Sequence, residues 1–209
     1  RPLKLLKASL SEAFFLGVAN FHSLSEHKPM RIDSRTCLIA GVNFVSSPNH
    51  DLRPEQTIID LIVIHNISLP PGNFGQGYIH ELFQNRLDSA KHPYFEEIKD
   101  LKVSSHLLIE RSGQLTQFVP FNRRAWHAGQ SEYQGRIACN DFSIGIELEG
   151  TDTEAYTASQ YSVLNAVITG LKMAYPKLSK NNIVGHSDIA PGRKTDPGPA
   201  FDWTRLHAS

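Results

Sequence analysis

The residues from Thr57 to Ile64 are β-branched or leucine at every position except Asp60. This pattern is typical of a strand buried on both faces, because a strand with one exposed face alternates apolar and polar residues. We therefore expect this run to form a central strand of a sheet. The run stops at His65, and the Pro- and Gly-rich residues 70–77 that follow predict a loop.

Two other regions predict further strands. Residues 142–149 alternate strictly between apolar and polar or small side chains, which predicts a strand with Glu147 and Glu149 on one face. Residues 103–110 and 115–119 look like two strands joined by the short, turn-prone segment 111–114, which predicts a β-hairpin.

Helical patterns alternate with these strands. A short helix is expected near residues 78–87. A longer one should begin at Thr157, which forms a capping-box pattern with Gln160, and end at Pro176. Ile183 and Val184 then predict a short strand. Together these elements predict a single α/β domain with a central mixed β-sheet flanked by helices.

The composition excludes several classes of function. Lysine plus arginine equals aspartate plus glutamate, at 21 each, so no overall charge would attract nucleic acid or an anionic membrane. No apolar run approaches the roughly 20 residues that span a bilayer. Cys37 and Cys139 form neither a metal-binding pair nor a disulfide framework, which favours a reducing compartment.

The first 29 residues differ from the rest of the 209. A basic start and an apolar patch at residues 13–19 resemble a weak signal peptide, but Ser11 and Glu12 interrupt it and no clear cleavage site follows. We therefore expect residues 1–29 to be an extension, namely an artificial remnant, a misplaced start or an accessory helix. Residues 30–209 should then form the functional domain, with a natural start at Met30.

Two histidines occupy similar places in the sequence. His65 and His186 each follow a short apolar strand, and Asp196 lies ten residues beyond His186 in a loop rich in proline and glycine. Two imidazoles and a carboxylate form a zinc site with a fourth position open to water, as a hydrolase requires. The chain has 10 histidines, however, and His106 or His127 could compete for this role; most single histidines are not ligands at all.

A general base and an oxyanion stabiliser are also available. Glu147 shares a strand face with Ser143 and Gly145, whose small side chains leave space that suits a substrate. Glu149 lies on the same face, so spacing alone cannot choose between the two glutamates, and either could be an ordinary surface residue. Lys194 could reach an oxyanion, or it could be a solvated loop lysine.

Long stretches of the chain resemble a known family. The resemblance covers roughly residues 42–206 and includes VIHNISLPPG, HPYFEEIKDLKVSSHLLI, VPFNRRAWHAGQSEYQG, CNDFSIGIELEGTDT and GHSDIAPGRKTDPGPAFDW. These motifs resemble the zinc amidases, a family that includes AmpD-type enzymes, phage amidase lysozymes and peptidoglycan recognition proteins. The resemblance implies their fold, one zinc ion per chain, and hydrolysis of the amide between (1,6-anhydro-)N-acetylmuramic acid and L-alanine. It further implies a small muropeptide substrate and a role in cytoplasmic cell-wall recycling.

The resemblance also assigns the site residues. It implies that His65, His186 and Asp196 bind zinc and that Glu147, rather than Glu149, forms the catalytic pair with Lys194. Other residues match substrate-binding positions: Asn66 and Lys102 for the peptide stem, and Tyr94, His106, Trp126 and His127 for the pocket wall. Relatives can carry arginine at the position of Lys102 and a basic residue at the position of Ala138.

Two alternatives remain at this point. Some peptidoglycan recognition proteins bind muropeptides without cutting them, but such proteins usually lack a ligand, and this chain has all three. An exported lytic amidase is the other alternative, and it depends on residues 1–29. Protein partners are not predicted by any motif.

Overall fold

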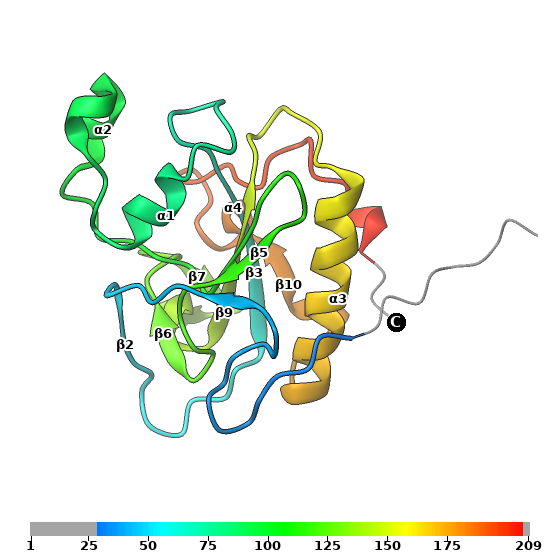
Figure 1. Ribbon diagram of the computed structural model, residues 1–209. Coiled ribbons are helices and arrows are strands. Elements are labelled where there is room, and N and C mark those ends of the chain that lie inside the picture. Colours follow the sequence, from blue (N-terminus) through cyan, green and yellow to red (C-terminus); the bar gives the residue numbers. More distant parts are fainter. Residues whose placement is uncertain (1–28, 207–209) are drawn as a thin grey trace, which may run out of the picture.

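The computed structural model describes residues 29–206, which form an α/β fold around one central sheet (Figure 1). The sheet has six strands, in the spatial order β1 (Asn43–Phe44), β5 (Leu115–Gln117), β4 (Leu107–Ile109), β9 (Ser143–Glu149), β3 (Leu61–Ile67) and β10 (Ile183–Gly185). β4 and β5 pair antiparallel, whereas the other neighbouring strands are parallel. The predicted mixed sheet is confirmed. The predicted extension lies outside the described residues, apart from Pro29.

Helices lie on both faces of the sheet. α3 (Ala158–Ala174) runs along one face, and α1 (Tyr78–Phe83) and α4 (His186–Ile189) pack on the other (Figure 1). α2 (Pro93–Ile98) follows α1 and lies farther from the sheet. None of the helices within residues 29–206 has the length and apolar character needed to cross a bilayer.

Smaller elements complete the described part of the chain. β2 (His50–Leu52) pairs with β6 (Arg123–Ala125), and β7 (Glu132–Tyr133) pairs with β8 (Arg136–Ile137). Short 3₁₀ helices occur at η1 (Ser89–Lys91), η2 (Cys139–Asp141), η3 (Lys180–Asn182) and η4 (Trp203–Arg205). The sequence did not predict these elements, since two or three residues are too few to show a periodicity.

Helix α3 begins with the predicted capping box. The Thr157 hydroxyl accepts from the Gln160 backbone N–H at 3.1 Å, and the Gln160 side chain accepts from the Thr157 N–H at 3.0 Å. The amide nitrogen of Gln160 also donates to the carbonyl oxygens of Ile109 and Glu149. These bonds fix the start of the helix against the ends of β4 and β9.

The strand predicted over residues 57–64 is displaced along the chain. It runs instead over Leu61–Ile67 as an interior strand, because β9 offers parallel partners from Ser143 to Glu149. Pairing therefore fixes the ends of this strand more strongly than apolar character does. The expectation that His65 lies beyond the strand is wrong, since His65 lies within it and pairs with Glu147.

Other predicted elements keep their type but are shorter. The hairpin predicted over residues 103–119 is confirmed, but its first strand is only Leu107–Ile109. The segment 101–105 is in no strand, so the expectation that Lys102 lies in a strand is wrong. α1 ends at Phe83, four residues before the predicted end, and β9 begins one residue late.

The sheet divides the hydrophobic core into unequal parts. The largest cluster lies between the sheet and α3. Two smaller clusters lie on the opposite face, one beneath α1 and one beside α4. Buried polar side chains lie on that same opposite face of β3 and β9, including His65, Ser143 and Glu147. Burying polar groups in a core costs free energy unless they are paired or serve a function, so this group marks the candidate site.

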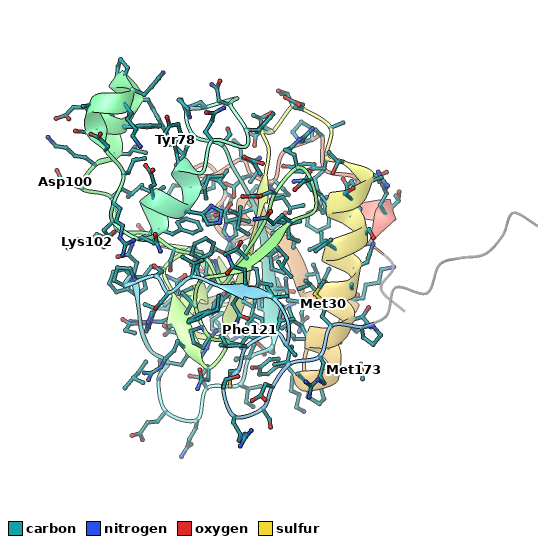
Figure 2. The ribbon with its side chains drawn as sticks, in the orientation of Figure 1. Met30, Tyr78, Asp100, Lys102, Phe121 and Met173 are labelled. Atoms are coloured by element: carbon teal, nitrogen blue, oxygen red, sulfur yellow. The ribbon has the colours of Figure 1, made fainter. Side chains whose placement is uncertain are left out.

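A substitution in α3 tests how the start of the described chain is anchored. We expect Gly170→Ala to destabilise the protein by about 1–3 kcal/mol, although alanine usually stabilises a helix. The reason is a clash, since a Cβ at Gly170 would lie 2.1 Å from the Met30 carbonyl oxygen. Met30 lies against α3 (Figure 2) and its N–H donates to Ala166. Urea denaturation measures the effect.

The matched control in the same helix is Ser162→Ala, at a half-buried position. It should change the free energy of unfolding by no more than about 0.5 kcal/mol. Equal stability of the Gly170→Ala variant and wild type would mean that the contact with Met30 does not hold in solution.

Candidate metal centre

Three side chains meet on the sheet face opposite α3. The Nδ1 atoms of His65 and His186 are 3.0 Å apart, and each is 3.1 Å from Oδ2 of Asp196. A tetrahedral zinc ion with bonds of about 2.0–2.1 Å holds its ligand atoms about 3.3 Å apart. The three atoms therefore form a triangle of nearly the required size.

Each of the three comes from a different element. His65 lies in β3, His186 begins α4 directly after β10, and Asp196 lies in the following loop. β3 and β10 pair in parallel, with Gly185 opposite Ile64, which places the two histidines side by side. The carbonyl oxygen of Asp196 accepts from the backbone N–H of Ser187, so the loop is tied back to α4.

The hydrogen bonds around His186 show what this triangle requires. Nε2 of His186 lies 3.1 Å from the carbonyl oxygen of Ala128, which can only accept, so this nitrogen carries the proton. In a neutral ring Nδ1 then holds a lone pair that points at the Asp196 carboxylate. Two facing acceptors need a cation between them. A proton can bridge two atoms, but the third atom, on His65, makes a metal ion the better fit.

Burial and neighbouring side chains together set the protonation of His65 and Asp196. Burial lowers the pKa of His65 to about 4, against the opposing effect of Asp196, so the ring is neutral at pH 7. Burial alone would raise the pKa of Asp196, but the adjoining His186 and His65 rings outweigh it and lower this pKa well below its usual range. A neutral imidazole and an ionised carboxylate are the forms that bind zinc.

The structure distinguishes the two glutamates of β9. Glu149 is fully engaged, because one oxygen accepts from the Gly75 N–H at 2.5 Å and the other from the Arg111 N–H at 3.1 Å. Glu147 pairs with His65 across the strands, and its buried Oε2 has no hydrogen-bond partner among the described residues. Burial, together with the nearby Asp196 charge, raises the pKa of Glu147 well above its usual value. Glu147 is thus the glutamate available for proton transfer.

The sequence suggested that the space above Ser143 and Gly145 would suit a substrate, but another side chain occupies it. The His127 ring fills it, and a Cβ at Gly145 would lie 2.4 Å from Cγ of His127. Nε2 of His127 is 3.1 Å from the Ser143 hydroxyl. The small residues of β9 therefore make room for a histidine, and the expected substrate position there is wrong.

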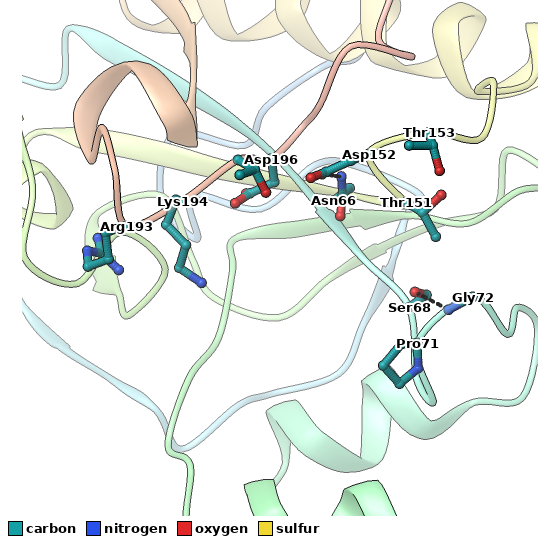
Figure 3. Close-up of a pocket in the computed structure, with 11 residues that line it drawn as sticks. Asn66, Ser68, Pro71, Gly72, Thr151, Asp152, Thr153, Arg193, Lys194 and Asp196 are labelled. Carbon is teal, nitrogen blue, oxygen red and sulfur yellow. Dashed lines mark hydrogen bonds between the residues drawn. The ribbon is translucent and has the colours of Figure 1, made fainter.

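A cavity of about 550 Å³ opens beside the metal-site residue Asp196. Its walls come from the end of β3 with residues 68–72, from residues 151–153, and from residues 193–196. Figure 3 shows Lys194 extending along this cavity beside Asp196, and the Lys194 side chain is exposed. Asn66 also lines the cavity, where its amide donates to Asp152 at 2.8 Å.

The remaining predicted substrate residues are not among those that line this cavity. Lys102 is exposed at one edge of the molecule, in the segment that follows α2 (Figure 2). Tyr94 is half-buried in α2, packed against the cluster beneath α1. Trp126 is half-buried as well. His106 is 0% exposed, with Nδ1 accepting from the Gly145 N–H and Nε2 facing the Arg123 carbonyl, so it lies in the core rather than at a surface.

Sequence reasoning missed two residues near the site. The Arg193 guanidinium donates to the carbonyl oxygens of Ala128 and Gln130 at 2.6 Å each, and it lines the cavity. The side chain of Asn140 accepts from the N–H groups of His127 and Ala128. Both residues lie outside strands and α-helices and far from these partners in sequence, so no local pattern could have revealed them.

Comparison with known proteins agrees with this geometry. The family model of N-acetylmuramoyl-L-alanine amidases matches residues 55–199. The 1,6-anhydro-N-acetylmuramyl-L-alanine amidase AmpD of Escherichia coli (strain K12) is 58% identical over 168 residues, which cover 80% of this chain and 91% of that protein. The corresponding enzyme of Enterobacter cloacae is 60% identical over 170 residues, covering 81% and 90%.

Solved structures give the same result. A crystal structure of an AmpD derivative superposes with a TM-score of 0.81 at 55% identity, covering 85% of this chain and 97% of that one. The chain therefore belongs to the N-acetylmuramoyl-L-alanine amidase family and, within it, to the AmpD-type enzymes.

Proposed function

We propose that this enzyme binds one zinc ion through His65, His186 and Asp196 and hydrolyses the amide between 1,6-anhydro-N-acetylmuramic acid and L-alanine in muropeptides. The observation that carries the proposal is the set of three acceptor atoms, 3.0–3.1 Å apart, beside a cavity of about 550 Å³. The names of the AmpD relatives supply the substrate class. Recycling of cell-wall fragments in the cytoplasm would be the setting.

The catalytic roles follow from the surroundings of each side chain. A zinc ion at this site would lower the pKa of a water molecule to about 7 and polarise the scissile carbonyl. Glu147 accepts the proton of the attacking water on Oε2, the oxygen that has no other partner among the described residues. Burial raises the pKa of Glu147 and so makes its carboxylate a stronger base, and the proton it has accepted can then pass to the leaving alanine nitrogen.

Lys194 and the cavity walls complete the proposal. Lys194 reaches along the cavity, where its ammonium can stabilise the negative charge that develops on the carbonyl oxygen. Asn66 offers an amide at the cavity wall to the peptide stem. Lys102, Tyr94 and Trp126 do not line the cavity, so their proposed contacts are with parts of the substrate that extend beyond it.

Removal of the metal tests the proposal directly. We expect the zinc-loaded enzyme to convert anhydro-muramoyl tripeptide into free tripeptide and anhydro-muramic acid, with one water added, as measured by mass spectrometry. Chelation should abolish the conversion, and added zinc should restore it. Substrate that stays intact in every sample, yet binds to the zinc-loaded protein, would show a binding module instead of an enzyme.

A further inference from the structure

His127 contacts the metal-site histidine His65 on the side of the ring that faces away from His186 and Asp196. The Nδ1 atom of His127 lies 2.9 Å from Nε2 of His65, the nitrogen that faces away from His186 and Asp196. The two rings meet edge to face, with centroids 5.0 Å apart. Both side chains are buried, so His127 lies beneath the metal site rather than on the wall of the cavity.

The direction of the hydrogen bond between His65 and His127 follows from the contact that His127 makes with Ser143. The Ser143 hydroxyl has one proton, and it donates that proton to the Cys139 carbonyl oxygen at 2.5 Å. Ser143 must therefore act as the acceptor in its 3.1 Å contact with Nε2 of His127. His127 carries its proton on Nε2, and its Nδ1 is left as an acceptor. Nε2 of His65 must then be the donor.

The contacts of the His65 ring place its proton. A histidine that binds a metal ion has one ring proton, and the 2.9 Å contact with the Nδ1 acceptor of His127 places that proton on Nε2 of His65. With that proton on Nε2, the Nδ1 of His65 presents a lone pair to the metal site. His186 is oriented in a similar way, since its Nε2 donates to the Ala128 carbonyl oxygen and its Nδ1 faces Asp196.

Asp196 works against this arrangement. Its carboxylate lies 3.1 Å from Nδ1 of His65 and would attract the ring proton to that nitrogen, where the proton would block the metal. An acceptor on the opposite side of the ring is needed to keep the proton on Nε2. His127 is that acceptor.

The fold holds His127 in place from two sides. Gly145 leaves the space that the ring occupies, because a Cβ there would overlap it. Asn140 accepts from the backbone N–H groups of His127 and Ala128, at 3.1 and 2.8 Å. One side chain thus fixes the segment that provides the outer contacts of both histidines.

We propose that His127 is a positioning residue: the chain from His65 through His127 and Ser143 to the Cys139 carbonyl fixes His65 in the tautomer that binds metal through Nδ1. The inference rests on the proposed zinc site. It assigns His127 a role beneath the metal, in place of the pocket-lining role that the family resemblance implies.

The test compares two substitutions of His127 with wild type. His127→Leu removes the acceptor, whereas His127→Asn keeps an oxygen close to the position of Nδ1. His80→Leu is the control, since His80 contacts Thr116 and Glu110 rather than the metal-site residues. The readouts are the tautomer of His65 in the metal-free protein, from ¹⁵N NMR of the imidazole ring, and zinc affinity, from competition with a chelating dye.

We expect His65 to carry its proton on Nε2 in wild type and in the His127→Asn variant. In the His127→Leu variant the proton should move to Nδ1 and the zinc Kd should rise by about 10–100-fold, with His127→Asn within about threefold of wild type. If the leucine variant does not fold, Ser143→Ala weakens the same chain and should shift the tautomer and the Kd in the same direction.

The outcomes separate this inference from the zinc site itself. A folded His127→Leu or Ser143→Ala variant with an unchanged His65 tautomer and unchanged zinc affinity would overturn the role of His127 and leave the zinc site intact. Wild-type protein that binds no zinc would instead remove the proposed function. The NMR measurement needs no metal, so it reads the tautomer in either case.

Discussion

A Glu147→Gln variant is expected to lose about 10²–10⁴-fold of the wild-type kcat, and its metal-free form should unfold at a higher temperature than wild type. The loss of rate follows because glutamine has the shape of glutamate but cannot accept the proton of the attacking water. The gain in stability follows from burial. Oε2 of Glu147 has no partner among the described residues, so an ionised carboxylate there is poorly compensated.

The stability gain should depend on pH in a defined direction. The pKa of Glu147 is raised in the folded protein, mainly by burial, so above the ordinary pKa of glutamate the unfolded chain binds fewer protons than the folded chain. Wild-type stability therefore falls, through this group, as pH rises from about 4.5 to the folded pKa, and the deficit stays constant above it. Glutamine does not titrate, so the difference in melting temperature between the variant and wild type should widen over this range.

Glu149→Gln is the matched control on the same strand face. Its oxygens hold the backbone N–H groups of Gly75 and Arg111, so the substitution should lower the melting temperature and leave most of the activity. Steady-state kinetics and thermal unfolding of both variants give opposite patterns if Glu147 transfers the proton and Glu149 only holds the two loops. Retention of wild-type kcat by Glu147→Gln would remove Glu147 from the mechanism.

Glu147 and Glu149 also show what a sequence pattern can predict and what it cannot. The alternation along residues 142–149 predicted correctly that both lie on one face of one strand. Their difference arises from Gly75 and Arg111, which are far away in sequence and reach Glu149 only once the loops have folded. A single-strand pattern contains no information about which loop will cover which end of the strand.

Features that depend on neighbouring residues in the sequence were predicted correctly, whereas features that depend on distant residues were not. The capping box at Thr157 and Gln160 is a local pattern, and α3 begins where that pattern places it. The ends of β3 depend on pairing with β9, and the apolar run alone placed them several residues too early. The position of His127 depends on Gly145, which is 18 residues away in sequence, so the small residues of β9 alone predict substrate space where the His127 ring lies.

Asp196→Ala is the second substitution with a large expected effect, on metal binding rather than on proton transfer. It removes the only carboxylate of the proposed set and leaves two imidazoles whose Nδ1 atoms are 3.0 Å apart. We expect zinc affinity to fall by more than the roughly 10–100-fold that loss of an outer contact causes, and amidase activity to become undetectable at micromolar zinc. Competition with a chelating dye and isothermal calorimetry measure the affinity.

Two further variants show whether the loss concerns the ligand or the fold. Asp196→Cys supplies a thiolate, which is also a zinc ligand, so it should bind zinc more tightly than the alanine variant does. Asp60→Ala removes a surface carboxylate paired with Arg136 and should leave zinc affinity at the wild-type level. The backbone bond from Ser187 to the Asp196 carbonyl survives every substitution at this position, so the loop should keep its place. An alanine variant that binds zinc as tightly as wild type would mean that the carboxylate lies beside the metal without binding it, and the ligand set would have to be sought among the neighbouring histidines.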